Sequence, residues 1–280
     1  MSSNFMPKQI TKYEAAHLTE LQGNVSETII DFTLDLMPPF RESDTIHDNA
    51  CGAGAVSEAI MARMSSTTNT IHIDATDINP QFVAGCKQLA QQHDWPLDAQ
   101  VMDAKDLGFP DNRFSHSFTF FALHCIGDAT AAAKEIYRTL EVGGIAATSV
   151  WVSMPHSDAI KHAHRRTRGK ECPLPVLLED DDFLQEDLKK ALQGGGFDNN
   201  KMKFYEKVAY ITVSDVRRWT QLAWSYLGAL PSGWLEDDEA HWEEALDDIF
   251  QQLNNAPGIS RNEKGEAVMK FVACIAIVTK

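Results

Sequence analysis

The sequence predicts an α/β fold built on a doubly wound, mostly parallel sheet, because strand-like and helix-like segments alternate between residues 45 and 150. The second strand-like run alternates Ile71, Ile73 and Ala75 with polar residues, whereas in the segment before it Val56, Ile60 and Met64 recur at helical spacing. Turn and capping residues separate the two kinds of segment. With 280 residues, 44% of them hydrophobic, the chain suits one large domain, or one domain that carries an inserted cap.

The first half of the chain supplies five expected strands. The first, residues 45–50, ends at a glycine turn that opens a helix. The second, residues 70–77, is followed by Asn79 as a helix cap and by Pro80 at the first helical position. Three more strands are expected at residues 97–104, 116–123 and 145–151, with a helix over residues 128–144 that two glycines close.

After residue 151 the alternation of strand and helix stops. Residues 155–182 are polar and broken by prolines, and we assign no element there. The later elements are a helix at residues 182–197, a strand at 201–213, helices at 214–228 and 236–255, and a last strand at 267–280. An insertion at about residues 214–255 can form a lid over the carboxyl edge of the sheet, where ligands bind in open α/β proteins.

Charge and composition exclude several classes of partner. The chain has 40 acidic and 25 basic residues, a net charge of −15, which disfavours nucleic acids and anionic membranes. The five cysteines are scattered without paired spacing, so we expect neither a disulfide framework nor a metal site. No signal peptide or membrane-spanning run is evident. We therefore expect a cytoplasmic protein with a small-molecule substrate, and the oligomeric state stays open.

The glycine turn after the first strand predicts a ligand site. The stretch HDNACGAG leaves the backbone bare at the start of a helix, where free N–H groups attract a ligand. A dinucleotide fingerprint would require a glycine at position 57, which is Ser57. Two later acids sharpen the prediction: Asp77 ends the second strand, where it can accept both hydroxyls of a ribose, and Asp103 ends the third, where it can bind the amino group of adenine.

These motifs resemble, in order, those of the class I S-adenosylmethionine-dependent methyltransferases, in the small-molecule branch. The matching stretches are HDNACGAG, IDATDINP, VMDAKDLGFPDNRFSHSFTFFALH and EIYRTLEVGG, which cover about residues 45–151. The resemblance implies a seven-stranded Rossmann-like sheet, S-adenosylmethionine as cofactor and S-adenosylhomocysteine as product. Ala50 departs from the pattern by replacing the usual first glycine. The cofactor residues it implies are Asp48, Ala50, Gly52, Gly54, Asp77, Ile78, Asp103, Ala104 and Phe120.

The resemblance also implies a division of the chain. Residues 1–44 would form helices that cover the cofactor site, and residues 45–153 the cofactor-binding α/β core. Residues 154–280 would complete the sheet and carry the helical lid.

Three residues are candidates for a catalytic base. Glu206 lies on an alternating strand among apolar residues, although a solvated position paired with a lysine explains it equally well. Asp215 follows Ser214 in the first turn of a helix, where an acid is expected for the helix dipole alone. His124 lies beyond the fourth strand, where a turn or packing role is as plausible as catalysis. A carboxylate would need an apolar setting to raise its pKa toward neutrality.

Aromatic residues are candidates for the substrate wall. Trp151 ends the fifth strand, Trp219 lies in the inserted helices, and Tyr13 lies in the N-terminal segment. Such a wall suits an apolar or aromatic small molecule and a sulfonium cation. Most of the helical stripe that contains Trp219 should nevertheless be ordinary core.

The sequence therefore predicts a methyltransferase that acts on a small organic molecule. The layout is similar to fungal bis-thiomethyltransferases of the gliotoxin type, which implies secondary metabolism and a thiol acceptor, with Glu206 or Asp215 accepting the proton. Oxygen, nitrogen and carbon acceptors stay open. A nicotinamide-dependent oxidoreductase is an alternative, but no Tyr-x-x-x-Lys pair occurs. A catalytically silent methyltransferase-like binding protein is the third reading.

Overall fold

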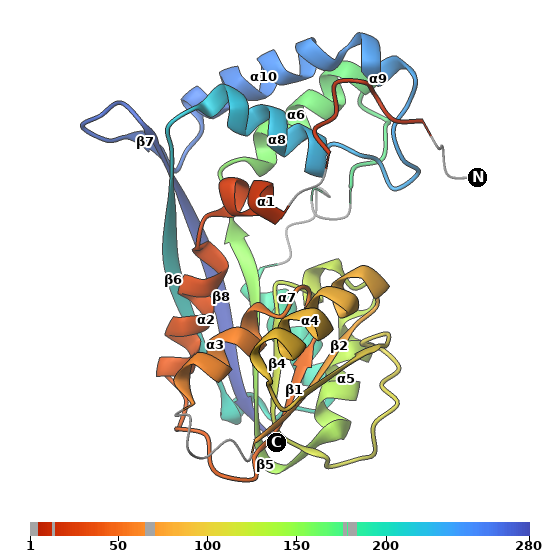
Figure 1. Cartoon of the computed structure of the whole chain (residues 1–280), viewed down its shortest axis with the longest axis vertical. Helices are drawn as coiled ribbons and strands as arrows, with labels where there is room; N and C mark the ends of the chain where they lie inside the picture. The colour runs from red at the N-terminus through yellow and green to blue at the C-terminus, as the bar shows by residue number, and fades with distance from the viewer. Residues whose placement is uncertain (1–4, 13–14, 65–70, 176–177, 179–183) are drawn as a thin grey trace. The chain divides into compact units, whose positions relative to one another are not determined.

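The structure is a computed structural model that describes residues 5–12, 15–64, 71–175, 178 and 184–280 (Figure 1). The chain forms two compact units, each assembled from three chain segments. We call them the helical unit (residues 1–25, 153–182 and 208–272) and the α/β unit (residues 26–152, 183–207 and 273–280). One mixed sheet has the order β3-β2-β1-β4-β5-β8-β6, and the short strand β7 pairs with β8.

The α/β unit contains the strands that the first half of the chain predicts. They are β1 (Thr45–Asn49), β2 (His72–Asp77), β3 (Leu97–Val101), β4 (Phe114–Phe120) and β5 (Leu140–Ser153). Strand β1 pairs in parallel with both β2 and β4, while β3 extends the sheet beyond β2 and β5 extends it beyond β4. The chain thus runs outward in opposite directions from β1 and β4, which creates a crevice at their carboxyl ends.

Helices flank these strands (Figure 1). They are α2 (Val25–Asp35), α3 (Ala55–Arg63), α4 (Pro80–His93), α5 (Ala129–Thr139) and α7 (Gln185–Gly195). Helix α4 packs on β2 and β3, and α5 packs on α7. The backbones of α5 and α7 approach closely at Gly195, where a side chain would not fit, since an added Cβ would lie 2.6 Å from the backbone carbon of Ala133.

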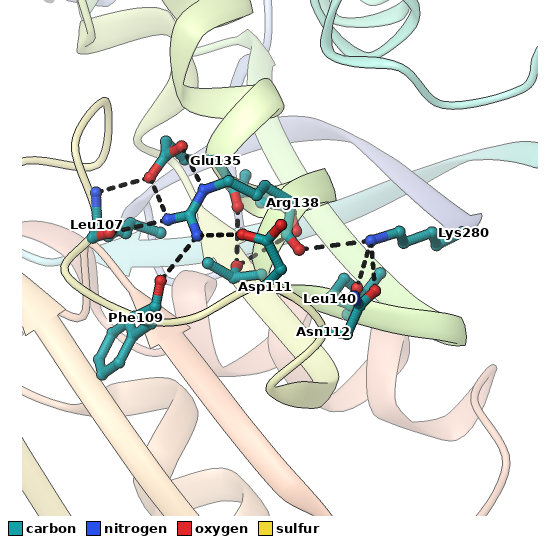
Figure 2. A network of polar contacts seen from close by, with 10 residues as sticks. Leu107, Phe109, Asp111, Asn112, Glu135, Arg138, Leu140 and Lys280 are labelled. Carbon is teal, nitrogen blue, oxygen red and sulfur yellow. Dashed lines mark hydrogen bonds and ion pairs between the residues drawn. The ribbon is translucent and has the colours of Figure 1, made fainter.

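The loop between β3 and β4 is anchored to α5 by Arg138 (Figure 2). The Arg138 guanidinium donates to the carbonyls of Leu107 and Phe109 at 2.9 and 2.8 Å, and to the carboxylates of Asp111 and Glu135. Glu135 in turn accepts from the Leu107 N–H at 2.8 Å. The side chain of Arg138 holds the pKa of Glu135 below its ordinary value. This loop begins at the predicted adenine residues, so its anchoring bears on the site.

The helical unit is built around buried tryptophans. Its elements are α1 (Ala15–Gln22), α6 (Ser157–Arg168), α8 (Val216–Leu227), α9 (Asp237–Ala240), α10 (Trp242–Asn255) and β7 (Ile259–Arg261). Helix α10 packs against α6 and α8. Arg168 lies over the rings of Trp224 and Trp234 and forms a buried ion pair with Asp238, with Nε to Oδ1 at 2.7 Å. None of the helices in the described part of the chain is long and apolar enough to cross a membrane.

Strands β6 (Met202–Val213) and β8 (Ala267–Thr279) each contribute residues to both units. With them the sheet path has seven strands, as the sequence predicts, and β7 adds an antiparallel partner to β8. The fold class is confirmed.

Several element boundaries differ from the expected ones. Helix α6 occupies residues for which the sequence predicts no element. It can form there because the prolines at 155, 173 and 175 flank the helix and none interrupts it. Helix α5 ends at Thr139, five residues early, since residues 140–144 already belong to strand β5. Positions 70, 182 and 183 of expected elements lie outside the described residues.

Candidate active site

The turn between β1 and α3 leaves its backbone accessible. Ala50, Gly52 and Gly54 all have left-handed backbone angles, with φ of 55°, 53° and 99°. A Cβ at Gly52 would stand in open space, whereas a Cβ at Gly54 would lie 3.1 Å from Sγ of Cys86 on α4. Gly54 therefore allows the turn to pack closely on α4, and Gly52 leaves room for a ligand to approach the backbone.

Asp48 lies just before this turn and is buried. Its Oδ2 accepts from the backbone N–H of Ser57 at 3.1 Å and from Ser57 Oγ at 2.6 Å. Because Ser57 is the third residue of α3, the Asp48 carboxylate satisfies a free amide at the start of that helix. Burial raises the pKa of Asp48 to about 7, against the opposing effect of the two hydrogen bonds from Ser57. Asp48 therefore stabilises the turn by binding Ser57 in the first turn of α3.

Asp77 joins the turn to the end of β2. Its Oδ2 accepts from the Gly52 N–H at 3.0 Å, and its Oδ1 accepts from the Asn79 N–H at 2.8 Å. Each carboxylate oxygen can accept a further hydrogen bond. The Asp77 carboxylate is thus held in place by two backbone groups while it keeps capacity for a ligand.

A pocket of about 190 Å³ lies at the carboxyl ends of β1, β2 and β3. Five of the nine predicted cofactor residues line it: Ala50, Asp77, Ile78, Asp103 and Ala104. The remaining lining residues, which the sequence analysis missed, are Asn49, Met102, Lys105, Cys125, Ile126 and Gly127. The pocket combines apolar side chains with a few polar groups, as sites for organic ligands do.

Asp103 forms the pocket wall at the start of the β3–β4 loop. Its Oδ1 accepts from the Lys105 N–H at 2.9 Å, and Lys105 Nζ lies 3.6 Å from its Oδ2. The side chains of Asp103 and Lys105 are both 40% exposed, so the carboxylate stays accessible to a ligand.

Phe120 ends β4 and is 9% exposed. The next residue, Phe121, has φ of 54°, which is strained for an aromatic residue, and its N–H donates to the Ser149 carbonyl at 2.9 Å. The ring of Phe121 stacks on that of Trp151, with centroids 4.1 Å apart and planes 6° apart. Strands β4 and β5 thus end in an aromatic pair.

The three candidate bases have different surroundings. His124 lies directly after β4, and both of its ring nitrogens are buried without a hydrogen-bond partner among the described residues. Burial lowers its pKa to about 4, so the ring is neutral at pH 7. Asp215 is the N-cap of α8, where its Oδ1 accepts from the Arg218 N–H at 2.9 Å. Glu206 is exposed on β6, on a strand face where Tyr210 is 57% exposed.

The remaining substrate candidates lie in the N-terminal segment and the helical unit. Trp219 is 1% exposed, and its Nε1 donates to the Leu21 carbonyl at 3.0 Å. Its ring therefore belongs to the core of the helical unit. Tyr13 lies outside the described residues. The roles of these residues and of the three bases stay predictions.

Asn49 is the missed residue with the clearest sequence signal. A polar residue stands between Asp48 and the turn, at a position of the first strand that the core should fill with an apolar side chain. Residues Cys125–Gly127 gave no comparable signal, because nothing in that stretch carries a charge or a distinctive spacing.

Comparison with known proteins identifies the class. Residues 47–148, from β1 to β5, match the family described as a methyltransferase domain. The chain thus contains a methyltransferase domain, and the named relatives described next are methyltransferases.

Two fungal methyltransferases are similar to this chain over more than two thirds of its length. Methyltransferase tpcH of Aspergillus fumigatus is 26% identical over 239 residues, which cover 82% of this chain and 83% of that protein. Acetylaranotin bis-thiomethyltransferase of Aspergillus terreus is 29% identical over 207 residues, or 69% of this chain and 68% of that protein.

Solved structures agree on the fold. YcgJ from Bacillus subtilis matches with a TM-score of 0.59 and 15% identity, over 90% of this chain and 99% of that one. Geranyl diphosphate C-methyltransferase from Streptomyces coelicolor, solved with S-adenosyl-L-homocysteine, matches with a TM-score of 0.53 and 13% identity, over 96% and 85%.

Proposed function

We propose that this protein transfers a methyl group from S-adenosylmethionine to a small acceptor of fungal secondary metabolism. The observation that carries the proposal is the pocket where the glycine turn, Asp77 and Asp103 border one space. The similarity to two Aspergillus methyltransferases supports this branch.

The residues around the pocket fit the parts of the cofactor. Asp77 would accept hydrogen bonds from the ribose hydroxyls, since its oxygens have free lone pairs. Asp103 and Ala104 would border the adenine, beside Ile78, whose side chain is 68% exposed. The open backbone at Gly52 would receive the methionine part. When bound there, the cofactor supplies an electrophilic methyl group, and the chain's own task is to align the acceptor and exclude water.

A thiol is the acceptor that we favour. The support is the similarity to a bis-thiomethyltransferase, together with a chemical argument. A thiol with an ordinary pKa of about 8.5 is partly ionised at neutral pH, so it needs only modest help from a base. The base that we propose is Glu206 or Asp215, and Glu206 is the one tested below because the Asp215 carboxylate also caps α8.

A phenolic oxygen is the second candidate, and the aromatic pair of Phe121 and Trp151 favours it. Stacked rings at the ends of β4 and β5 suit a flat aromatic acceptor. A phenol has an ordinary pKa of about 10 and needs a hydrogen-bond acceptor more than a thiol does. Neutral His124 is the group that we propose to accept that bond, since neither ring nitrogen has a partner among the residues that the structure describes.

Ligand binding tests the proposed cofactor. We expect S-adenosylhomocysteine to raise the melting temperature of the protein, and NAD and NADP to leave it unchanged. Asp77→Ala should abolish the shift, because it removes the ribose acceptor and the bond to Gly52. Asp98→Ala, which removes an exposed carboxylate from β3, is the matched control and should keep the shift. A shift with NAD, or none with S-adenosylhomocysteine, would contradict the proposal.

Turnover tests the acceptor. Labelled S-adenosylmethionine is incubated with panels of small thiols, phenols and amines, and we expect label in the thiols. Glu206→Ala should still bind the donor and should lose turnover most at low pH, where less of the thiol is ionised. Equal turnover of Glu206→Ala and the parent at every pH would remove Glu206 as the base.

A further inference from the structure

Four polar residues form a row across the sheet, and one of them, Asn49, lines the pocket. Thr76 on β2 is paired with Asn49 on β1, and Thr119 on β4 is paired with Thr148 on β5. The pairing of Asp48 with Phe118 places Asn49 beside Thr119. All four side chains are at most 1% exposed. Burying a polar group is costly unless hydrogen bonds satisfy it, and side-chain hydrogen bonds link three of the four residues: Thr76, Asn49 and Thr119.

Thr76 is at the centre of the hydrogen bonds in this row. Its hydroxyl donates to Asn49 Oδ1 at 3.4 Å, and the Asn49 amide donates to Thr119 Oγ1 at 3.2 Å. Nε2 of His47 lies 2.9 Å from the same Thr76 oxygen. The Thr76 hydroxyl thus has two polar partners, and the direction of its bond with His47 depends on the tautomer of that ring.

Thr76 also contacts both neighbours of Ala50. Its hydroxyl binds the side chain of Asn49, the residue before, and its carbonyl accepts from the N–H of Cys51, the residue after, at 2.9 Å. Ala50 has φ of 55°, a conformation that glycine adopts freely and that strains an alanine. Strained residues keep such angles when the surrounding bonds hold them.

We propose that Thr76 is a positioning residue: through Asn49 and Cys51 it holds Ala50 in the left-handed conformation and thereby keeps the cofactor turn in its binding shape. The inference rests on the proposed cofactor site. It implies that Thr76 matters because residue 50 is an alanine. A glycine at position 50 would adopt the turn without that support.

Thr76→Val tests the first part, because it removes the hydroxyl at nearly constant volume. We expect the variant to bind S-adenosylhomocysteine about fivefold to tenfold more weakly in calorimetry, the loss that one hydrogen bond corresponds to. Thr76→Ser keeps the hydroxyl and should bind like the parent. Thr148→Val is the matched control: Thr148 is fully buried in the same row, and its Oγ1 has no partner among the described residues. An equal loss for Thr148→Val, or none for Thr76→Val, would overturn the proposal.

The second part requires the Ala50→Gly background. There Thr76→Val should weaken binding by less than about twofold, because glycine relieves the strain that Thr76 opposes. A residue with a merely structural role would cost the same affinity in both backgrounds, and that result would overturn the inference. If Thr76→Val alone does not fold, the double variant decides: binding like Ala50→Gly supports the role, and lost binding overturns it. Failure of the parent protein to bind S-adenosylhomocysteine would instead contradict the proposed function.

Discussion

At the scale of single residues, Asp48 illustrates how burial changes a carboxyl group. The folded-state pKa of about 7 lies above the ordinary value of 3.8, so the native state binds a proton that the unfolded state releases between these pH values. The contribution of Asp48 to stability therefore falls as pH rises from about 4 to 7, and above pH 7 the loss is complete.

Asp48→Asn should remove this dependence. The amide still accepts a hydrogen bond from Ser57 but does not ionise, so we expect the variant to gain stability relative to the parent as pH rises. Urea unfolding at pH 5 and pH 8 measures the difference, which should be larger at pH 8. A difference that is the same at both pH values would show that burial does not shift Asp48 in this way.

The sequence could predict the residues whose role follows from their place in the chain. Asp77 and Asp103 close strands, and the turn before α3 is rich in glycine, so their meeting at one edge follows from parallel pairing alone. The role of Asn49 could not be read in this way. Its partners Thr76 and Thr119 are 27 and 70 positions away, and only the register of three strands brings them together.

At the scale of elements, the β3–β4 loop depends on one side chain of α5. Arg138→Met should weaken binding of S-adenosylhomocysteine, because the loop that begins at Asp103 loses its bonds to Leu107 and Phe109 (Figure 2). It should also lower the free energy of unfolding by about 1–2 kcal/mol, since it removes hydrogen bonds to two carbonyls and a partly exposed ion pair. Calorimetry and urea unfolding measure the two effects.

Lys134→Met is the control for this prediction. Lys134 is an exposed residue of the same helix, so its substitution changes charge and helix propensity in a similar way without touching the loop. Equal losses in Arg138→Met and Lys134→Met would mean that the loop does not need its anchor.

Elements were predictable where burial and local pattern agree. Strand β4 alternates phenylalanines with polar residues, and this alternation predicts a strand, although the structure buries all seven of its residues and so both of its faces. Helix α6 is strongly polar, and only four of its residues are buried, one of them a histidine: Ala159, Ile160, Ala163 and His164. These residues are on the side of α6 that packs against α10, a helix that begins more than 70 positions later in the chain. The same limit applies to Glu206, whose apolar neighbours on β6 lie on a face that the fold leaves partly exposed.

At the scale of the whole molecule, chain order does not define the compact units. Each unit collects three separate segments, and strands β6 and β8 contribute to both. The expected three-part division of the chain follows sequence order, so it stays a prediction about function. What the sequence could not supply is the set of contacts between segments far apart along the chain, because packing decides them.

Five histidines with lowered pKa values make the stability of the protein sensitive to acid. Burial lowers the pKa of His124 and His156 to about 4, that of His47 and His164 to about 3, and that of His116 below its ordinary value. Each takes up a proton on unfolding once the pH falls below the ordinary value of 6.5. Between pH 6.5 and about 4, the unfolded state therefore binds more protons, and stability falls as pH is lowered.

We expect the free energy of unfolding to fall by as much as about 1.4 kcal/mol per pH unit for each of these histidines. Asp48 changes the stability in the opposite direction over part of this range, but it is one group against five histidines. Urea unfolding at pH 7, 6 and 5 measures the trend. His47→Gln should make the decline less steep, because one buried imidazole no longer titrates, whereas His93→Gln, at an exposed position on α4, should leave it unchanged. A stability that is constant from pH 7 to pH 5 would show that these rings are accessible to water and protons in the folded protein.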